Sequence, residues 1–565
     1  MPDKILLKAM SSLEKCFLTD CICEKEERTE FTVFRNQPFA CQIGFWREGE
    51  PGSNGLINFK TRHKLTCEGS LKPYVTLRRV VNVPSEFPCN ETTCDDLYIK
   101  REPGLFPDLL QPMHYEGSIS LTHRQLHAIW IGADFPEDAP AGDYSLTVSI
   151  SDPKTGEPLA EKTITVRLLD AKLPPQRLIH TEWFYTDCLA QFYHTRAFSE
   201  KHWSIIENFI ACAVRNGITM ILTPIFTPEL DTYIGGERLT TQLLDITVTG
   251  KDQYEFGFEK VERWIDLCQR LGVRYFEIPH FFTQWGAAHA PKIIATVNGK
   301  KKRIFGWETD ACGEEYSSFL AQMITALVEF LEKKGVAQNT YFHISDEPHL
   351  EHLDQYLRCK NQIEPYLKGL PILDALSDYA FYESGALKTP APAIKHLGPF
   401  LENKVENLWA YYCGDSGIKT IASCVTGRMM AMPLFRTRIL GIQLWLNNIK
   451  GFLHWGFNFY NNQNSYEQIN PFLYTDGEYF APSGDTFLVY PGDDGKPWDS
   501  IRLNALREGI EDMRLLDLCA EKLGRERVEE IITEVAGMPI TFREYPHDTN
   551  FLNRLRDRLI DEIGL

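Results

Sequence analysis

The stretch "TYFHISDEPHLEHLDQY", residues 340–356, has the pattern of a strand, a short loop and a helix. It opens as an apolar strand, passes through Asp346, Glu347 and Pro348, and continues with the spacing of an amphipathic helix. Proline suits the first turn of a helix because its fixed φ is already helical. The stretch therefore predicts one β/α unit with two adjacent carboxylates at the C-terminal end of its strand.

The same unit recurs on both sides of this stretch. Residues 199–217, "SEKHWSIIENFIACAVRNG", have Ser199 as a candidate N-cap, apolar residues at a period of 3.6 and Gly217 just past the end. Residues 258–272, "FEKVERWIDLCQRLG", repeat the helical pattern. A buried strand is predicted directly after each helix, so the order of elements alternates as in a parallel α/β fold.

Eight apolar runs of strand length follow the linker near residue 175. They are "LIHTEWFY", "ITMILTPIF", "RYFEIPHFF", "TYFHISDEP", "PILDALSD", "ENLWAYYC", "GFLHWGFNFY" and "DTFLVYPG". Eight such units predict a (β/α)8 TIM barrel, which the helix within residues 499–524 would close. A doubly wound sheet is the weaker alternative, because no G-x-G-x-x-G motif opens the first βα turn.

The first part of the chain has a different rhythm. Residues 142–170, "GDYSLTVSISDPKTGEPLAEKTITVRLLD", alternate polar and apolar positions around a turn, which is typical of an antiparallel β-sandwich. The predicted fold class is therefore multi-domain β plus α/β. We expect a β-sandwich accessory domain at 1–172, a TIM-barrel catalytic domain at 177–520 and a short helical C-terminal tail at 521–565.

Composition limits the classes of partner. The 565 residues carry a net charge of −18, which argues against binding to phosphate backbones or anionic lipid and hence against nucleic acid or membrane partners. The start has no clear signal peptide, so a cytoplasmic location is expected, and a homodimer is one expected assembly. Single cysteines within apolar elements indicate reduced thiols, and the pairs Cys21/Cys23 and Cys89/Cys94 lack the C-x-x-C spacing of metal sites.

In a TIM barrel the active site lies at the C-terminal ends of the strands. Those ends are rich in aromatic and polar residues, including Trp409, Tyr411 and Tyr412 after one run. Aromatic faces pack against the C–H faces of pyranose rings, whereas core packing is the alternative for any single Trp or Tyr. The predicted substrate-binding residues are Trp183, His280, Trp285, Asp378, Tyr379, Trp455, Asn458 and Tyr490.

Asp346 and Glu347 have two interpretations. Either carboxylate could cap the helix that follows Pro348. At a barrel mouth, however, two neighbouring carboxylates can hold different protonation states. Adjacent carboxylates reach the same side of a glycosidic bond, which suits substrate assistance: the 2-acetamido oxygen attacks the anomeric carbon, Asp346 steadies the acetamido nitrogen and Glu347 protonates the leaving oxygen.

The sandwich, the barrel motif "HISDEP" and the run "RTRILGIQLWLNNIKGFLHWGFNFYN" resemble glycoside hydrolase family 123. The resemblance implies a retaining β-N-acetylgalactosaminidase that releases terminal GalNAc from glycosphingolipid-type glycans or derived oligosaccharides through an oxazoline intermediate. It assigns Asp346 and Glu347 as the adjacent acid pair. It also places Tyr411, in "WAYYC", near the acetamido carbonyl, and Trp455 at the floor of the sugar site.

Two other functions stay open from sequence. One is a metal-dependent hydrolase that uses His343, His349 and His352, although no H-E-x-x-H motif is present. The other is a non-catalytic glycan-binding protein. We predict a glycosidase with no cofactor and no metal, and the sequence leaves the choice between GalNAc and GlcNAc open.

Overall fold

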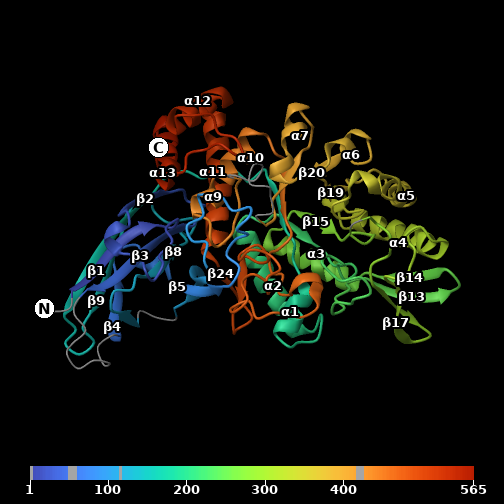
Figure 1. The fold of residues 1–565 in the computed structure, drawn as a ribbon, viewed down its shortest axis with the longest axis horizontal. Coiled ribbons are helices and arrows are strands. Elements are labelled where there is room, and N and C mark those ends of the chain that lie inside the picture. The colour runs from blue at the N-terminus through green and yellow to red at the C-terminus, as the bar shows by residue number, and fades with distance from the viewer. Residues whose placement is uncertain (1–3, 49–59, 114–116, 285, 415–424) are drawn as a thin grey trace.

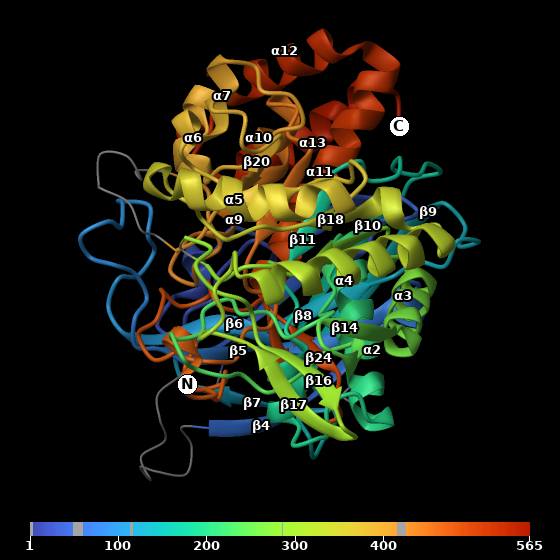
Figure 2. The same cartoon turned by 90° about the vertical axis from the view of Figure 1, so that its right-hand side faces the viewer.

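The computed structural model describes residues 4–48, 60–113, 117–284, 286–414 and 425–565. Figure 1 shows the N-terminal sheets at one end of the molecule, the parallel strands and their helices at the other, and the C-terminal helices α12 and α13 along one edge. Figure 2 shows α4 and α5 side by side on the outer surface.

The N-terminal part consists of two five-stranded sheets with a hydrophobic core between them. The first sheet has the order β1 (Lys4–Ser11), β3 (Phe39–Glu48), β8 (His127–Ala133), β5 (Val75–Ser85) and β6 (Gly104–Pro112). The second has the order β2 (Glu30–Val33), β10 (Pro158–Leu168), β9 (Gly142–Ser151), β4 (Lys60–Glu68) and β7 (Ser118–Thr122). Neighbouring strands are antiparallel except β2 and β10. The predicted β-rich N-terminal part is confirmed.

The central sheet has six strands, and every described pair in it is parallel. Its order is β18 (Thr340–Phe342), β15 (Tyr275–Ile278), β12 (Met220–Leu222), β11 (Ile179–Glu182), β22 (Gly451–His454) and β21 (Trp409–Tyr411). A second parallel pair consists of β19 (Leu373–Ala375) and β20 (Thr389–Ala391). Single parallel bridges join Phe342 to Ile372 and Ala393 to Tyr411, at the two ends of this pair.

The expected ring of eight regular strands is thus only partly present as continuous sheet. Seven of the eight predicted runs contain a parallel strand, but the eighth, "DTFLVYPG", does not. Its strand, β23 (Val489–Pro491), pairs antiparallel with β24 (Pro497–Asp499). The apolar character of this run has another cause, because it packs beneath the N-terminal sheets, where Tyr490 is fully buried. The unpredicted strand is β20, whose three residues "TPA" give no strand pattern.

Helices follow the strands, but their lengths differ strongly. The described helices of the α/β part are α1 (Thr186–Phe192), α2 (Glu200–Arg215), α3 (Glu259–Leu271), α4 (Glu314–Lys333), α5 (Leu353–Ile363), α6 (Tyr379–Glu383), α7 (Gly398–Glu402), α9 (Leu434–Arg438), α10 (Leu440–Leu446) and α11 (Ile501–Leu523). Helix α2 begins as predicted, since Ser199 accepts a hydrogen bond from the amide of His202. After β19 and β20 the helices α6 and α7 have only five residues each, so the α/β pattern is irregular there.

Two further pieces complete the fold. A four-stranded sheet in the order β14 (Gln253–Gly257), β13 (Asp245–Gly250), β16 (Ile293–Val297) and β17 (Lys300–Phe305) is inserted after strands β12 and β15. The chain ends with α12 (Arg525–Ala536) and α13 (Thr549–Glu562), which pack against α11. A helical C-terminal region is therefore present as predicted.

Asp108 on β6 and Arg502 on α11 join the N-terminal sheets to the α/β part. Two hydrogen bonds of 2.8 and 2.9 Å connect their side chains, and both side chains are fully buried. The Tyr490 hydroxyl donates to the same carboxylate at 2.7 Å. A buried ion pair is favourable only when its hydrogen bonds are made, and these bonds require Asp108 and Arg502 to be in contact. The pair therefore fixes the position of the N-terminal sheets relative to the α/β part.

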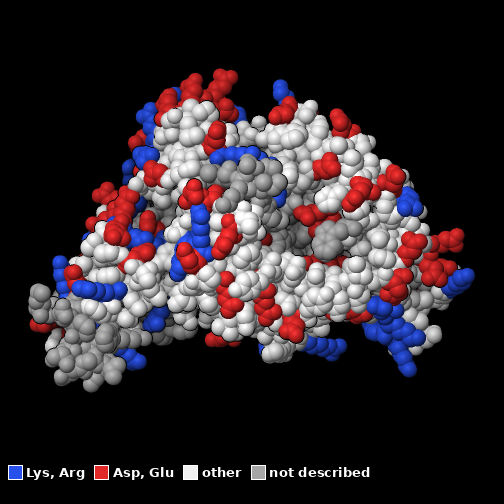
Figure 3. All heavy atoms as spheres, in the orientation of Figure 1, with Lys and Arg blue, Asp and Glu red and all other residues white. Residues whose placement is uncertain are grey.

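The surface and the thiols are unexceptional. Among the described helices, none combines the length and hydropathy that a membrane span needs. Acidic and basic side chains are interspersed over the face drawn in Figure 3. No disulfide joins the described cysteines.

Candidate active site

Asp346 and Glu347 lie in the loop that follows β18, and both are partly exposed to a cavity. Neither caps a helix. His349 is the N-cap of the one-turn 3₁₀ helix Leu350–His352, and α5 begins only at Leu353. Glu347 has a φ of +44°, which is unusual for a residue other than glycine and is held at a cost that is typical of functional sites.

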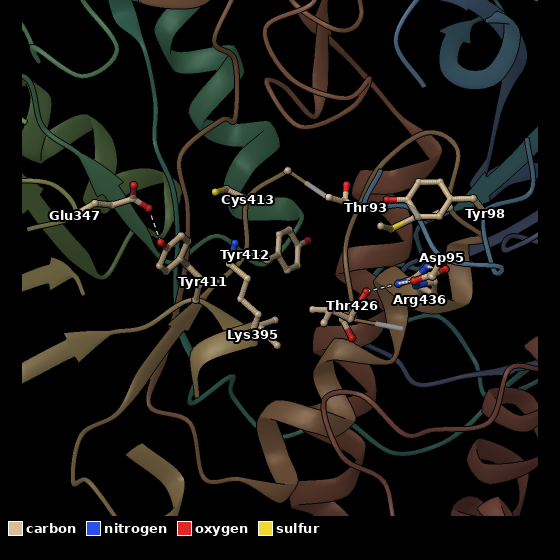
Figure 4. A pocket seen from close by; sticks show the side chains of 15 residues that line it. Thr93, Asp95, Tyr98, Glu347, Lys395, Tyr411, Tyr412, Cys413, Thr426 and Arg436 are labelled. Carbon is tan, nitrogen blue, oxygen red and sulfur yellow. Dashed lines mark hydrogen bonds and ion pairs between the residues drawn. The ribbon is translucent and has the colours of Figure 1, made fainter. Parts of the chain in front are cut away.

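Tyr411, the last residue of β21, connects the acid pair to the opposite side of the cavity. Its hydroxyl donates a hydrogen bond to Oε1 of Glu347, as the dashed line in Figure 4 marks. Tyr411 is buried, whereas Glu347 is partly exposed. The phenol therefore orients one oxygen of the carboxyl group and leaves the other for a ligand.

The cavity has a volume of about 480 Å³ and opens at the C-terminal ends of the parallel strands. Among its walls are Asp346, Glu347, Tyr411, Trp183 and Trp455, five of the residues that the sequence singled out. Two carboxylates, a phenol and two indoles are a suitable set for binding a pyranose ring, because the indoles offer apolar faces and the polar groups bind hydroxyls. These five side chains are brought together as expected.

A buried network supports the floor of the cavity. The Trp183 indole donates to Oε1 of Glu277 at 2.7 Å. His343 lies 2.7 Å from the same Glu277 oxygen through Nε2 and 3.1 Å from Oδ1 of Asp374 through Nδ1. Burial lowers the pKa of His343, but the hydrogen bonds to Asp374 and Glu277 outweigh it and raise that pKa to about 9. His343 is therefore an imidazolium held between two carboxylates.

The same network tests the alternative prediction of a metal-dependent hydrolase. Among the described residues, His280, His343 and Asp374 bring potential ligand atoms within 4.8 Å of one another. Both ring nitrogens of His343 already face carboxyl groups of Glu277 and Asp374, and the three side chains of this set are one fewer than the four ligands of a closed site. His349 and His352, which sequence grouped with His343, lie at the exposed start of the next helical turn instead. The ligand set does not fit a closed metal site.

The electrostatics of the acid pair are asymmetric. Burial, and then the neighbouring Glu347 carboxylate, raise the pKa of Asp346 well above its usual range, while His343 opposes the shift. Asp346 therefore takes up a proton more readily than an ordinary aspartate does. Any ligand group that donates a hydrogen bond to Asp346 favours its ionised form instead.

Several predicted substrate ligands lie elsewhere. The Asn458 side chain is buried and bonds both the amide and the carbonyl of Tyr185, so it holds the backbone. Asp378 caps α6 by accepting from Ala380 and Phe381, and the next residue, Tyr379, packs against Phe400. These three residues are not among those that line the cavity.

The remaining predicted ligands also differ from expectation. Tyr490 is fully buried against Asp108, which conflicts with a role in binding substrate. His280 is stacked on His343 with ring centroids 4.4 Å apart, below the cavity floor, and neither of its ring nitrogens has a hydrogen-bond partner among the described residues. Trp285 lies outside the described residues.

Sequence reasoning missed several polar residues of the cavity. Asp485, which precedes β23, accepts hydrogen bonds from the Trp455 indole at 3.2 Å and from the Gly414 amide at 2.9 Å. Burial opposes its ionisation, but His454 and Arg428 lower its pKa below the usual range, so it is a carboxylate. Asp231 and Gln284 also line the cavity and come from long loops. Their only signal in the sequence is that they lie between strands.

The N-terminal part also contributes to this cavity. Phe87 and Asn90 line it and belong to the segment between β5 and β6, residues 86–103. Phe87 packs face to face with Tyr479 at 5.8 Å, and its amide donates to Asp476 at 2.9 Å. The segment 86–103 is therefore part of the site.

The site combines a cavity at the C-terminal ends of parallel strands with an adjacent pair of carboxylates and indole walls. This combination is typical of carbohydrate-cleaving enzymes. The sequence profile described as "Glycoside hydrolase 123, catalytic domain" matches residues 183–519, more than half of the chain. The chain belongs to glycoside hydrolase family 123 and is a glycoside hydrolase.

Comparison with solved structures gives the fold of the whole chain. A family 123 glycoside hydrolase from Clostridium perfringens, described in work on glycolipid glycan hydrolysis, aligns over 99% of both chains with a TM-score of 0.72 and 14% sequence identity. A β-glucuronidase from Ruminococcus gnavus aligns over 91% of this chain and 69% of its own, with a TM-score of 0.31 and 9% identity. No curated protein matches the chain in sequence.

Proposed function

We propose that this glycoside hydrolase releases terminal β-linked N-acetylgalactosamine from glycans, with retention of configuration and with assistance from the substrate's own acetamido group. The observation that carries the proposal is that Asp346 and Glu347 are adjacent on one loop and line one cavity beside Trp455. In enzymes whose two carboxylates act on opposite faces of a sugar, the two groups lie on either side of the ring. Two carboxylates that are adjacent in the chain instead reach the same side of the glycosidic bond.

In the first step the acetamido oxygen attacks the anomeric carbon while the bond to the leaving oxygen breaks. Glu347 gives its proton to that oxygen, and Asp346 accepts the N–H of the acetamido group as positive charge develops there. The product is an oxazoline or its protonated form. Water then attacks the anomeric carbon and gives a proton to Glu347, and the acetamido group is restored.

The electrostatics support this division of roles. In the free enzyme, burial and Glu347 raise the pKa of Asp346. The acetamido N–H supplies a hydrogen bond to the ionised form of Asp346, which lowers its pKa when substrate binds. With Asp346 engaged by the acetamido N–H, Glu347 is the carboxyl group left to serve the leaving oxygen. Tyr411, whose hydroxyl bonds Glu347 and lines the same cavity, is the proposed donor to the acetamido carbonyl once substrate has displaced that bond.

Two finer points belong to the same proposal. The six-stranded sheet and the pair β19–β20, joined by the bridges Phe342–Ile372 and Ala393–Tyr411, form one (β/α)8 barrel whose wall is irregular at β19 and β20. The substrate class is glycolipid-type glycans or oligosaccharides derived from them, as the resemblance implies. Asp231 and Gln284 are candidate ligands for the sugar hydroxyls that distinguish GalNAc from GlcNAc.

The test is release of 4-nitrophenol from the β-GalNAc and β-GlcNAc glycosides by wild type and by Glu347→Gln, with and without EDTA. We expect turnover of the GalNAc compound that EDTA does not change and that Glu347→Gln lowers by at least a hundredfold. Glu351→Gln is the matched control, because Glu351 is exposed and not among the cavity-lining residues. Equal turnover by Glu347→Gln would refute the assignment.

The stereochemical claim needs a separate measurement. Proton NMR of the first product should show the β-anomer of the released sugar before mutarotation. A thiazoline analogue of the oxazoline should inhibit at concentrations far below those of the free sugar, because it resembles the intermediate. Initial release of the α-anomer would exclude retention.

A further inference from the structure

Exposed apolar side chains gather at the end of the molecule that carries the active site. Of the eleven large hydrophobic residues that are exposed in the described part of the chain, seven lie in three loops, 223–244, 343–352 and 455–488. These loops follow the C-terminal ends of β12, β18 and β22, three of the parallel strands. Exposed apolar residues that are scattered singly need no explanation, whereas their concentration at one end indicates an interaction surface.

Two of these loops meet at a pair of tyrosines beside the cavity. Tyr233 and Tyr466 stack face to face with ring centroids 4.4 Å apart, and Ile234, the residue after Tyr233, is 79% exposed. The amide of Tyr233 donates to the carbonyl of Asn464 at 3.0 Å, and the amide of Asn464 donates to the carboxylate of Asp231 at 3.1 Å. Asn464 and Asp231 line the active-site cavity, whereas Tyr233 and Tyr466 do not. The two tyrosines therefore lie just outside the cavity, next to its wall.

A further exposed tyrosine lies beside the same cavity. Tyr479 is 61% exposed and stacks on Phe87, which lines the cavity. Its segment is tied to the one that carries Tyr466, because Nδ2 of Asn462 donates to the carboxylate of Glu478 at 3.0 Å. We call the four exposed side chains the apolar rim, which consists of Tyr233, Ile234, Tyr466 and Tyr479.

We propose that the apolar rim rests on the surface of a lipid bilayer while the terminal sugar of a glycolipid occupies the cavity, an inference that rests on the proposed function. The lipid anchors a glycolipid in the bilayer, so an enzyme that takes its terminal sugar brings the mouth of the cavity towards the bilayer surface. The residue types of the rim suit this contact. Isoleucine gains free energy by leaving water, and tyrosine, with an apolar ring and a polar hydroxyl, is enriched at membrane–water interfaces.

The charges of the three loops favour a bilayer of zwitterionic lipid. Together the loops contain one Lys or Arg, namely Arg238, which is buried and pairs with Asp187. Attraction to anionic lipid needs clustered basic residues near the bilayer surface. The net charge of −18 and these loops therefore disfavour an anionic surface. Apolar contact with uncharged or zwitterionic headgroups needs no basic residue.

The experiment presents one glycan in two forms. One is a ceramide-linked glycan that ends in β-GalNAc, embedded in phosphatidylcholine vesicles, and the other is the same glycan free in solution. Ile234→Ser combined with Tyr466→Ser removes exposed apolar surface without adding charge, and neither residue lines the cavity. This double variant should lower kcat/KM for the vesicle substrate about tenfold and should leave kcat/KM for the free glycan unchanged.

Leu159→Ser is the matched control, because Leu159 is 43% exposed but lies on β10 in the N-terminal sheets. It should change neither activity. Co-flotation with the same vesicles measures the contact without cleavage. Glu347→Gln, which leaves the glycolipid intact, should need about tenfold more vesicle lipid for half-maximal co-flotation once it also carries the two rim substitutions.

Equal losses on the vesicle substrate and the free glycan, or unchanged co-flotation in the rim variant, would overturn the inference. So would a wild-type dimer, detected by light scattering, that the two rim substitutions convert to a monomer, because the rim would then bind a second copy of the chain. Failure of the proposed function has a different signature, namely no cleavage of the free glycan by wild type, and co-flotation still decides whether the rim contacts the bilayer.

Discussion

Tyr411 and Glu347 are 64 positions apart in the chain, and the Tyr411 hydroxyl donates a hydrogen bond to Oε1 of Glu347. The two residues come from opposite ends of the six-stranded sheet, Tyr411 from β21 and Glu347 from the loop after β18. Strands β19 and β20 lie between them, so the contact spans the irregular part of the strand arrangement. The position of the proposed acid therefore depends on how this part of the fold closes.

We predict that Tyr411→Phe lowers kcat for the GalNAc aryl glycoside by about ten- to a hundredfold, less than Glu347→Gln does. The phenol orients one oxygen of Glu347 and is a candidate donor to the acetamido carbonyl, but it transfers no proton. Steady-state kinetics with both variants measure the order. If Tyr411→Phe were as damaging as Glu347→Gln, the tyrosine would have to take part in proton transfer.

We predict that binding of a thiazoline analogue weakens as the pH falls through the pKa of Asp346, at a pH above the ordinary value of 3.8. Asp346 must be ionised to accept the N–H mimic, and burial and Glu347 raise its pKa in the free enzyme. Glu347→Gln removes the neighbouring negative charge, so this pKa falls and the midpoint should move to lower pH. Inhibition constants measured across pH 3 to 8 give both midpoints, and an unchanged midpoint in Glu347→Gln would contradict the coupling.

The backbone of Glu347 allows a prediction about stability. Its φ of +44° lies in the left-handed region, where a Cβ atom is unfavourable and glycine is not. We expect Glu347→Gly to be more stable than Glu347→Ala by about 1 kcal/mol, while both are inactive. Urea unfolding of the two variants provides the comparison. If alanine were the more stable substitution, the conformation would not be strained.

Sequence could predict much of the fold because buried parallel strands are continuous apolar runs, and seven of the eight such runs contain a parallel strand. Strand β20 escaped because it has only three residues, one of them a proline, which is too few to show a strand pattern. The run around Tyr490 was wrongly predicted to be a strand of the parallel sheet. It is apolar because the N-terminal sheets cover it, and periodicity cannot distinguish the two kinds of burial.

The site was predictable where it depends on strand ends. Trp183 and Trp455 directly follow their strands, Tyr411 ends its strand, and Asp346 and Glu347 lie in the loop after β18. All five line the cavity. Asp485 and Asp231 come from loops whose course depends on tertiary contacts, and Phe87 comes from another part of the chain. No local pattern of residues indicates such positions. Asn458 follows a strand as expected, but its amide is used to hold the backbone of Tyr185.

The last prediction concerns the joint between the two parts of the chain. Asp108→Ala should lower the free energy of unfolding by about 3 to 5 kcal/mol, because it leaves the fully buried guanidinium of Arg502 without its carboxylate, with only the carbonyls of Gly484 and Phe487 as acceptors. Asp96→Ala is the matched control, since Asp96 is fully exposed in its pair with Arg101, and little change is expected. Urea unfolding, followed by tryptophan fluorescence, measures both.

The ion pair between Asp108 and Arg502 also positions the segment 86–103 against the active site. Asp108→Ala should therefore lower kcat/KM for a disaccharide substrate under conditions where the protein remains folded. Full activity and wild-type stability in Asp108→Ala would show that the two parts associate without this ion pair.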